Sequence, residues 1–269
     1  MRRILIAILM LVCLTNTVHA QEWNLVWSDE FNVNGLPDST KWGYEVGYIR
    51  NNELQYYTRA RMENARLEDG LLVIEGRKEM YDIPDSQPDS KRGNADYTAA
   101  SLTTQNKANW TYGRIEVRAK LPRGQGVWPA IWTLGANIEE INWPRCGEID
   151  IMEYIGREPT TIHGTLHYAI DGRHQGNGKS IEHPEPFTDF HIYAAEWYPD
   201  RIDIFFDDNL YQSFNTDTAG EGEDNPFRKP HYLLINLALG GNWGGELDDS
   251  ILPQRYLIDY VRVYEQIDP

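Results

Sequence analysis

Cysteine is nearly absent from this chain. Two of its 269 residues are cysteines, Cys13 and Cys146, and the first lies in an N-terminal leader described below. A single remaining thiol excludes an internal disulfide. Cys146 stands just before the acidic residue Glu148, but its setting is apolar and no histidine partner is evident. We therefore interpret Cys146 as a packed side chain and not as a nucleophile.

Long hydrophobic runs are also missing, except at the start of the chain. The apolar segment at residues 4–14 follows two arginines and leads to small residues at 18–20. This order is typical of a secretory signal peptide, and the run is too short to span a bilayer. We expect cleavage to remove residues 1–20 and to leave residues 21–269 as one secreted or periplasmic domain without a membrane span.

Positive charge is scarce. The chain has 25 Lys and Arg residues against 41 Asp and Glu residues, which gives a formal net charge of −16. Such a surface repels nucleic acids and anionic membranes, and it suits a neutral ligand better than a strongly sulfated polysaccharide. Aromatic residues are plentiful instead. Nine tryptophans and sixteen tyrosines supply core packing, and they also offer flat faces on which sugar rings stack.

No long amphipathic helix is evident either. Short runs of alternating apolar and polar residues recur at residues 70–75, 113–121, 201–206, 232–237 and 256–264. Clusters of Gly, Pro, Asn and Asp separate them, and residues 82–96 have the composition of an exposed loop. This pattern predicts an all-β fold, a sandwich or jelly roll, formed as a single domain.

The segment at residues 147–154 places three carboxylates in an otherwise apolar, strand-like run. Burying carboxylates is costly, so their presence there indicates function and not stability. Glu148 and Asp150 lie on one face of a strand, and Glu153 lies on the other unless a β-bulge at residues 151–152 turns it back. We predict that bulge. A row of acids in a groove indicates glycoside hydrolysis, in which one carboxylate attacks and another donates a proton.

Tryptophans flank the acidic segment. If residues 128–134 form a strand, Trp128 and Trp132 share one face, where they serve either as a sugar-stacking platform or as core. Pro129 fits a strand edge or a bulge better than a central strand. Trp143 lies in the loop that leads into the acidic segment, which favours contact with a ligand.

Two histidines follow the acidic segment. His163 and His167 have a spacing seen in zinc sites, but the glutamate of an H-E-x-x-H motif is missing and the segment is typical of a strand. We therefore predict no zinc site there. His167 either reaches the acids from a neighbouring strand or makes a hydrogen bond at the surface.

Taken together, these residues resemble glycoside hydrolase family 16, and within it the bacterial laminarinases, which are endo-β-1,3-glucanases. The motifs that carry the resemblance are at residues 27–31, 51–57, 128–132, 148–153, 164–167, 236–241 and 259–264. The acidic signature E-x-D-x-x-E is similar to that of laminarinases, agarases and carrageenases, whereas members specific for mixed-linkage glucan have E-x-D-x-E. One position departs from the pattern, because Ser101 stands where members often have an arginine.

The resemblance implies a concanavalin A-like β-jelly-roll sandwich with a substrate cleft across its concave sheet. It implies a retaining mechanism with Glu148 as nucleophile, Glu153 as acid/base and Asp150 assisting, and the charges of Glu148 and Asp150 should raise the pKa of Glu153. The implied substrate contacts are Asn51, Trp128, Trp132, Trp143, His167 and Trp243. No cofactor is implied for catalysis. A structural Ca²⁺ is implied at Glu30, the Gly70 carbonyl and Asp259.

We therefore expect a secreted, monomeric endo-β-1,3-glucanase that hydrolyses laminarin-like glucans through a covalent glycosyl-enzyme intermediate. Four alternatives stay open on the sequence alone. They are a mixed-linkage β-1,3/1,4-glucanase, another hydrolase with the bulged motif such as an agarase, a transglycosylase, and a non-catalytic glucan-binding protein.

Overall fold

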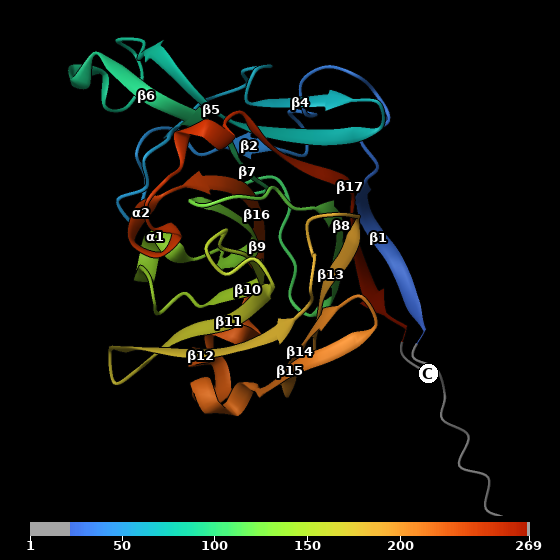
Figure 1. Cartoon of the computed structure of the whole chain (residues 1–269). Coiled ribbons are helices and arrows are strands. Elements are labelled where there is room, and N and C mark those ends of the chain that lie inside the picture. The colour runs from blue at the N-terminus through green and yellow to red at the C-terminus, as the bar shows by residue number, and fades with distance from the viewer. Residues whose placement is uncertain (1–21, 268–269) are drawn as a thin grey trace, which may run out of the picture.

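The computed structural model describes residues 22–267, which form two β-sheets packed face to face (Figure 1). The larger sheet has ten strands. Their spatial order is β15 (Asn209–Asn215), β14 (Arg201–Phe206), β13 (His191–Trp197), β8 (Gly113–Lys120), β17 (Gln254–Gln266), β5 (Leu71–Asp82), β6 (Asn94–Ala99) and β3 (Tyr56–Tyr57), with β1 (Trp23–Asp29) beside β17 and β4 (Ala65–Glu68) beside β5.

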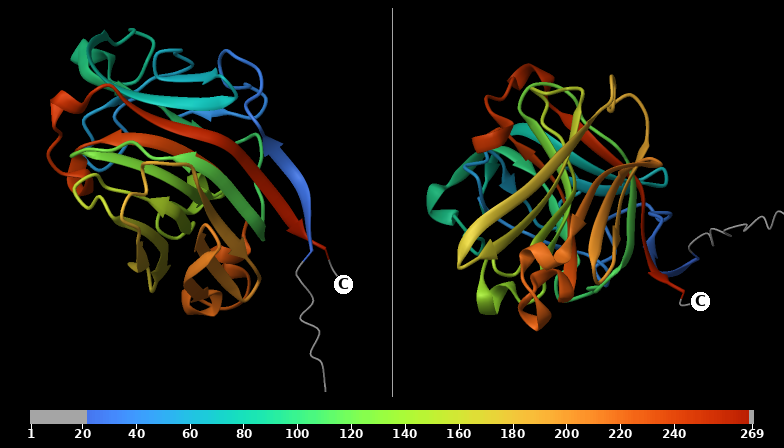
Figure 2. Two further views of the ribbon diagram at one scale, coloured as in Figure 1. Left: turned by 45° about the vertical axis from the view of Figure 1, so that its right-hand side comes forward. Right: turned by 90° about the horizontal axis from the view of Figure 1, so that it is seen from below.

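The smaller sheet has seven strands. Their spatial order is β12 (Arg173–Glu182), β11 (Thr161–Ile170), β10 (Glu148–Glu153), β9 (Val127–Gly135), β16 (His231–Leu239), β7 (Ser101–Thr103) and β2 (Gly43–Tyr44). Among the described strands, β3 with β6 is the one parallel pair. This arrangement confirms the predicted all-β sandwich. Figure 2 shows both sheets curving, with β1 running beside the long C-terminal strand β17.

The core lies between the sheets because successive side chains of each strand point to opposite faces. In β8, Ile115, Val117 and Ala119 face inward and are at most 3% exposed, while the charged residues between them face outward. Strands β9 and β16 are different, because every residue in them is buried. Both faces of these two central strands are therefore covered by other parts of the protein.

Helices are few and short in the described part of the chain. They are α1 (Ile138–Ile141), α2 (Gly241–Gly244), and the 3-10 turns η1 (Ser90–Arg92), η2 (Thr216–Ala219), η3 (Gly222–Asp224), η4 (Pro226–Arg228) and η5 (Asp249–Ile251). Within residues 22–267, none of them has the length and apolar character needed to traverse a bilayer. The leader predicted at residues 1–20 lies outside the described part of the chain.

The prediction for Pro129 was wrong. Pro129 lies within β9, a strand flanked by β10 and β16, and not at a sheet edge. Its carbonyl accepts a hydrogen bond from the backbone N–H of Tyr154 at 3.2 Å. In an antiparallel ladder the N–H and C=O of one residue face the same neighbour. An N–H at position 129 would therefore point toward Tyr154, which lies beyond the last residue of β10. Its absence in proline removes no hydrogen bond from the pairing of β9 with β10.

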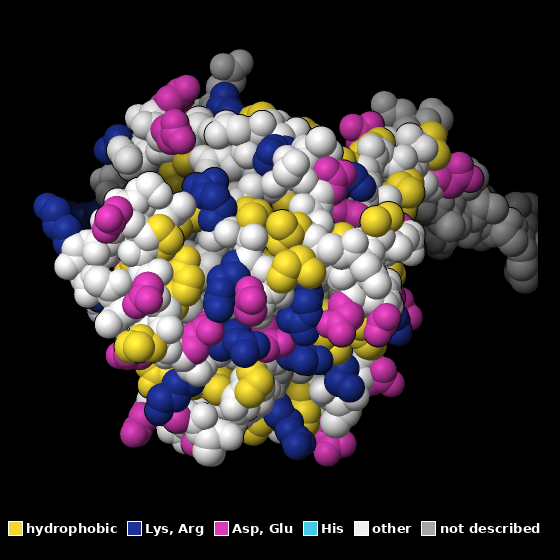
Figure 3. All heavy atoms as spheres, turned by 90° about the horizontal axis from the view of Figure 1, so that it is seen from above, with side chains coloured by type: hydrophobic (Ala, Val, Ile, Leu, Met, Phe, Trp, Pro, Cys, Tyr) yellow, Lys and Arg dark blue, Asp and Glu magenta, His cyan; other side chains and the backbone are white. Residues whose placement is uncertain are grey.

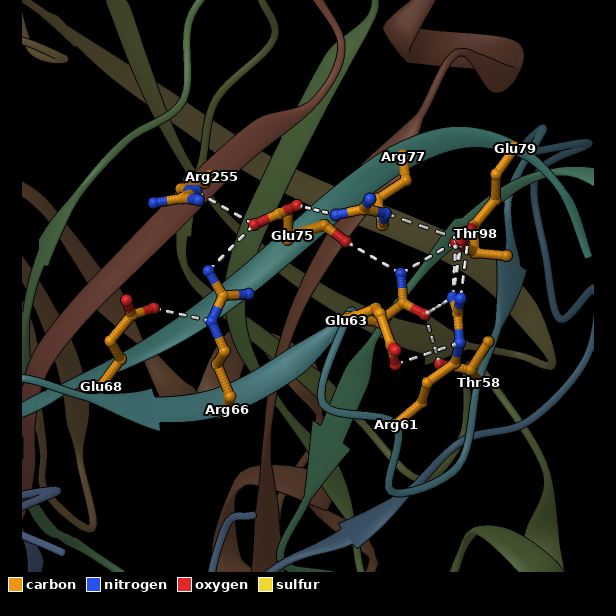
Figure 4. Close-up of polar contacts among 11 residues, drawn as sticks. Thr58, Arg61, Glu63, Arg66, Glu68, Glu75, Arg77, Glu79, Thr98 and Arg255 are labelled. Atoms are coloured by element: carbon orange, nitrogen blue, oxygen red, sulfur yellow. Dashed lines mark hydrogen bonds and ion pairs between the residues drawn. The ribbon is translucent and has the colours of Figure 1, made fainter. Parts of the chain in front are cut away.

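The outer face of the larger sheet carries charges of both signs, which intermingle over β4, β5 and β17 (Figure 3). Glu75 lies at the centre of this network with a side chain that is 2% exposed. Its carboxylate accepts hydrogen bonds from Arg66 at 3.1 Å and from Arg255 at 3.0 Å, and it also pairs with Arg77 (Figure 4). Three cations thus compensate one buried acid and tie three neighbouring strands together.

Candidate active site

The acidic segment forms β10, and its backbone contains the predicted bulge. Against β9, Asp150 pairs with Trp132 and Met152 pairs with Ile131, so Ile151 is the extra residue. Ile151 and Met152 are both fully buried in the core between the sheets. Two successive side chains therefore point inward, which reverses the alternation for the residue that follows.

The bulge turns Glu153 to the face that Glu148 and Asp150 occupy. The same one-residue shift appears against β11, where Asp150 pairs with Thr165 and Glu153 with His163. All three acids line one cleft of about 450 Å³ on the outer face of the smaller sheet. This volume is within the range of small-molecule sites. The row of carboxyl groups predicted from the sequence is therefore present, on the strand and with the kink that were predicted.

Each outer glutamate is held by an indole N–H. Trp143 Nε1 donates to Glu148 Oε2 at 2.7 Å, and Trp128 Nε1 donates to Glu153 Oε1 at 3.0 Å. A hydrogen bond of this kind fixes the direction of the carboxyl and stabilises its ionised form. The two tryptophans therefore orient the two acids from opposite ends of the row.

Two histidines lie beside the central acid. His167 Nε2 lies 3.2 Å from Asp150 Oδ2 and 4.0 Å from Glu148 Oε1. On its other side, His167 Nδ1 lies 2.8 Å from His174 Nε2, and His174 also packs on the ring of Trp143 with centroids 4.7 Å apart. His167 therefore reaches the acids from β11, and His174 of β12 contacts both His167 and Trp143.

Burial raises the pKa of all three carboxyl groups. The pKa of Glu148 rises to about 8, first because of burial and then because of the charge of Asp150. Burial raises the pKa of Asp150 to about 7. The pKa of Glu153 lies well above its usual range, chiefly because of burial and then because of the other two acids. The predicted direction for Glu153 is thus correct, although burial is a larger cause than the neighbouring charges. His167 and Trp143 act the other way on Glu148 and lower its pKa.

The predicted contacts Asn51, Trp128, Trp132 and Trp143 line the cleft. Their exposures differ, because Trp143 is 46% exposed whereas Trp128 and Trp132 are 8% and 6% exposed. The two buried indoles do not form an open stacking platform. They act as hydrogen-bond donors in the cleft floor, and Trp143 offers the accessible aromatic face.

An arginine enters the cleft from a loop. The Arg50 guanidinium lies 4.8 Å from the ring centre of Trp132 and pairs with Glu45. Glu45 also accepts a hydrogen bond of 2.6 Å from Ser101 Oγ, at the position where the resemblance leads us to expect an arginine. Ser101 therefore binds the carboxylate that pairs with Arg50.

Sequence reasoning missed Glu53. Its buried carboxyl accepts hydrogen bonds from Tyr57 at 3.1 Å and from Asn51 at 3.3 Å. Tyr57 accepts from Asn236 at 3.0 Å, and Asn236 accepts from Trp132 Nε1 at 2.7 Å. Burial raises the pKa of Glu53. Glu53 therefore anchors a polar chain along the wall of the cleft, and its place within the 51–57 motif was the available signal.

Trp243 stands behind the cleft. Its ring packs edge-on against Trp128 with centroids 5.4 Å apart, and also against His163 at 5.0 Å. It is not among the residues that line the described cleft. Trp243 therefore supports Trp128 from behind.

The residues of the implied Ca²⁺ site lie apart from the cleft. Strand β17 pairs with both β1 and β5, which brings Glu30, Gly70 and Asp259 toward one end of the larger sheet. Glu30 accepts two hydrogen bonds from Arg262, at 2.9 and 2.8 Å, and Asp259 pairs with Arg118. The donor set suits a hard cation, and a bound ion would compete with these arginines for the carboxylates.

Cys146 is fully buried. Burial, and then the charge of Glu148, raises the pKa of its thiol to about 11. A thiol in this state is not a nucleophile at neutral pH. The interpretation of Cys146 as a packed side chain is confirmed.

Comparison with known proteins gives one consistent family. Residues 53–262 match the model of glycosyl hydrolases family 16. A β-glucanase of Rhodothermus marinus is 46% identical over 261 residues, which cover 93% of this chain and 87% of that protein. A glucan endo-1,3-β-glucosidase of Cryptopygus antarcticus is 40% identical over 235 residues, 83% of each chain. The solved structure of the laminarinase from Rhodothermus marinus aligns with a TM-score of 0.81 at 46% identity, over 92% of this chain and 99% of that one.

Proposed function

This chain belongs to glycosyl hydrolases family 16, and from that premise we propose that it is a secreted, retaining endo-β-1,3-glucanase acting on laminarin-like glucans. One observation carries the proposal. The bulge in β10 brings Glu148 and Glu153 to the same wall of a cleft, with Asp150 between them. Retaining glycosidases need two carboxyl groups close together on either side of the scissile bond.

Two displacements account for the reaction. Glu148 attacks C1 of a glucosyl unit while Glu153 gives its proton to the departing glycosidic oxygen, so an ester forms at Glu148 as the glycosidic bond breaks. Glu153, now ionised, takes a proton from water, and the water oxygen attacks C1 and releases Glu148. Two inversions at C1 leave its configuration unchanged.

The environments of the two glutamates support this division of roles. Glu153 has a pKa well above its usual range and therefore holds the proton that an acid must donate. The pKa of Glu148 is raised as well, to about 8, and Trp143 and His167 limit that rise by favouring the ionised form. Ester formation neutralises Glu148, which weakens the repulsion on Glu153 and lets it act as a base in the second step.

Release of reducing sugar from laminarin tests the roles. Glu148→Ala and Glu153→Ala should each lower kcat by about 10²–10⁴-fold or more, since each removes one of the two chemical groups. Glu140→Ala, which removes an exposed acid from α1, serves as the matched control and should keep wild-type activity. Wild-type kcat in either cleft variant would remove that residue from the mechanism. NMR of the first product should show the β anomer, and an α anomer would contradict retention.

A panel of laminarin, lichenan, agarose and carrageenan separates the alternatives. We expect laminarin to be cleaved fastest, and lichenan cleavage would indicate tolerance of mixed linkage. Products longer than the substrate, formed with added acceptor oligosaccharide, would indicate transglycosylation. The presence of both Glu148 and Glu153 in one cleft argues against a purely glucan-binding role.

Secretion and a monomeric state complete the proposal. Residues 1–20 have the order of a signal peptide. Intact mass of the exported protein should give a mature chain that begins at Gln21, and size-exclusion chromatography with light scattering should give the mass of one chain. A retained leader or a dimer mass would contradict the respective statement.

A further inference from the structure

On the side of β11, the bulge in β10 lies opposite a glycine. The register leaves Ile151 and Met152 of β10 facing the single residue Gly164 of β11. Gly164 is buried at an inward position, and its neighbours along β11 are only partly buried. Two inward side chains of β10 therefore lie beside a position of β11 that contributes no side chain. The space on the inner face at this position is open to a residue from the other sheet.

Tyr211 of β15, in the larger sheet, fills the space at Gly164. A Cβ on Gly164 would lie 2.6 Å from the Tyr211 hydroxyl, a separation so short that one of the two groups would have to move. Gly164 is not among the described glycines with a positive φ. Its missing side chain therefore matters for space and not for backbone conformation, because it lets the tyrosine reach the bulged strand.

Strand β15 has a bulge of its own at Tyr211. Gln212 and Leu210 pair with successive residues of β14, so Tyr211 is the extra residue. A bulge changes the direction in which a side chain points. The Tyr211 ring is partly buried and packs against the core between the sheets. The irregularity in β15 is therefore the local reason why this tyrosine points toward β10.

The two bulges meet at a hydrogen bond. The Tyr211 hydroxyl donates to the carbonyl of Ile151 at 3.4 Å, and Ile151 is the extra residue of β10. The ladder is disrupted at a bulge, so a donor from outside the sheet helps to satisfy the extra residue. Burial, and then the charges of Asp150 and Glu153, raise the pKa of Tyr211, so its hydroxyl stays protonated and can donate. The bond is long for a hydroxyl donor, so we expect its removal to have a modest effect.

We propose that Tyr211 is a positioning residue for Glu153. Its hydroxyl holds the carbonyl of Ile151, and this contact keeps the bulge in the form that turns the following glutamate into the cleft. Glu148 and Asp150 precede the bulge and keep their face without it. Tyr211 therefore acts on the acid/base and not on the nucleophile. The inference rests on the proposed function and adds to it a residue that does not line the described cleft.

Two substrates with different leaving groups test this role. Tyr211→Phe keeps the ring and removes the hydroxyl. Cleavage of a β-1,3-oligosaccharide needs the proton of Glu153, whereas the dinitrophenyl glycoside of a β-1,3-linked glucose disaccharide releases an anion that leaves without one. We expect kcat/KM to fall about three- to fivefold on the oligosaccharide, the equivalent of one weak hydrogen bond. On the aryl glycoside, kcat/KM should stay at the wild-type level, because it reports only the steps up to glycosylation.

Tyr44→Phe is the matched control. Tyr44 lies in β2, at the edge of the smaller sheet opposite β12. Its hydroxyl is buried and has no hydrogen-bond partner within residues 22–267. This variant should keep wild-type kcat/KM on both substrates. An equal loss on the two substrates in Tyr211→Phe would indicate general loosening of the fold and overturn the proposal, as would wild-type values on both.

A double-mutant cycle in Tm tests the contact itself. Gly164→Ala should lower Tm, because the added methyl group meets the Tyr211 hydroxyl. The loss should be smaller when the substitution is combined with Tyr211→Phe, since the closest atom is then absent. Equal losses in the two backgrounds would show that the contact is not made and would overturn the proposal. A wild-type protein that cleaves neither substrate would instead refute the proposed function.

Discussion

Replacing Asp150 with asparagine is expected to move the pH–activity profile toward acid. Asp150 is 2% exposed, and its charge raises the pKa of both Glu148 and Glu153. Asparagine keeps the size of the side chain and removes the charge. The pKa of each glutamate then falls, so the acidic limb, set by ionisation of Glu148, and the basic limb, set by deprotonation of Glu153, both move to lower pH.

The size of the shift follows from the spacing of the groups. Polar atoms of Glu148, Asp150 and His167 all lie within 4.8 Å of one another. Two unit charges at this separation repel by about 3 kcal/mol at an effective dielectric constant of about 20, and this energy corresponds to about two pKa units. Burial raises the pKa of Asp150 itself to about 7, below the pKa of about 8 of Glu148, so Asp150 is mostly ionised over the acidic limb. We therefore expect the acidic limb to move by about two units.

The assay is kcat/KM for a soluble β-1,3-oligosaccharide across the pH range in which the wild type is folded. Asp208→Asn is the matched control, since it removes one exposed carboxyl outside the described cleft and should leave both limbs in place. An acidic limb of Asp150→Asn that stays at the wild-type pH, or moves to higher pH, refutes the electrostatic coupling described here. A fall in kcat alone does not bear on the argument, because the position of the limbs is the quantity predicted.

Three further predictions concern the support of the site and of the fold. His174→Asn removes the partner of His167 Nδ1. It should lower kcat about fivefold, the equivalent of one hydrogen bond of about 1 kcal/mol, with little change in KM. An equal change in kcat and KM would contradict a positioning role for His174. Glu75→Ala leaves three arginines without their acid. It should lower the free energy of unfolding by about 2–3 kcal/mol and Tm by about 5–10 °C. This loss of stability is smaller than for a fully buried ion pair because Arg255 is 56% exposed. Calcium should raise Tm relative to EDTA in the wild type and not in Glu30→Gln, and a Tm that is indifferent to calcium in both proteins would argue against the metal site.

The sheets were predictable because their pattern is local. The alternation at residues 201–206 coincides with β14, and the alternation at 113–121 differs from β8 by one residue. The bulge was predictable for a different reason. A regular strand would have sent Glu153 into the core, and the high free energy of a buried, unpaired carboxylate favours the bulged alternative.

Contacts between distant segments were not predictable in the same way. Arg50 and Glu53 look like ordinary loop charges in the sequence. Only the packing of the loop on the sheet brings Arg50 over Trp132 and links Glu53 to Asn236 through Tyr57. The low exposure of Trp128 and Trp132 likewise depends on what covers the outer face of the smaller sheet. Periodicity in the sequence predicts which face of a sheet a side chain occupies, but it does not predict which other residues cover that face.

The bulge in β10 makes the packing of the protein interior independent of which carboxyl groups face the cleft. Ile151 and Met152 both fill the interior opposite a single position of β9. If one of them were deleted, the strand would become regular and the last carboxyl would still fall on the outer face, two positions after Asp150. The interior would lose one apolar side chain, at a stability loss of about 2–5 kcal/mol. Deletion of one residue from the bulge would therefore leave a cavity in the protein interior, while the order of the acids that face the sugar would stay the same.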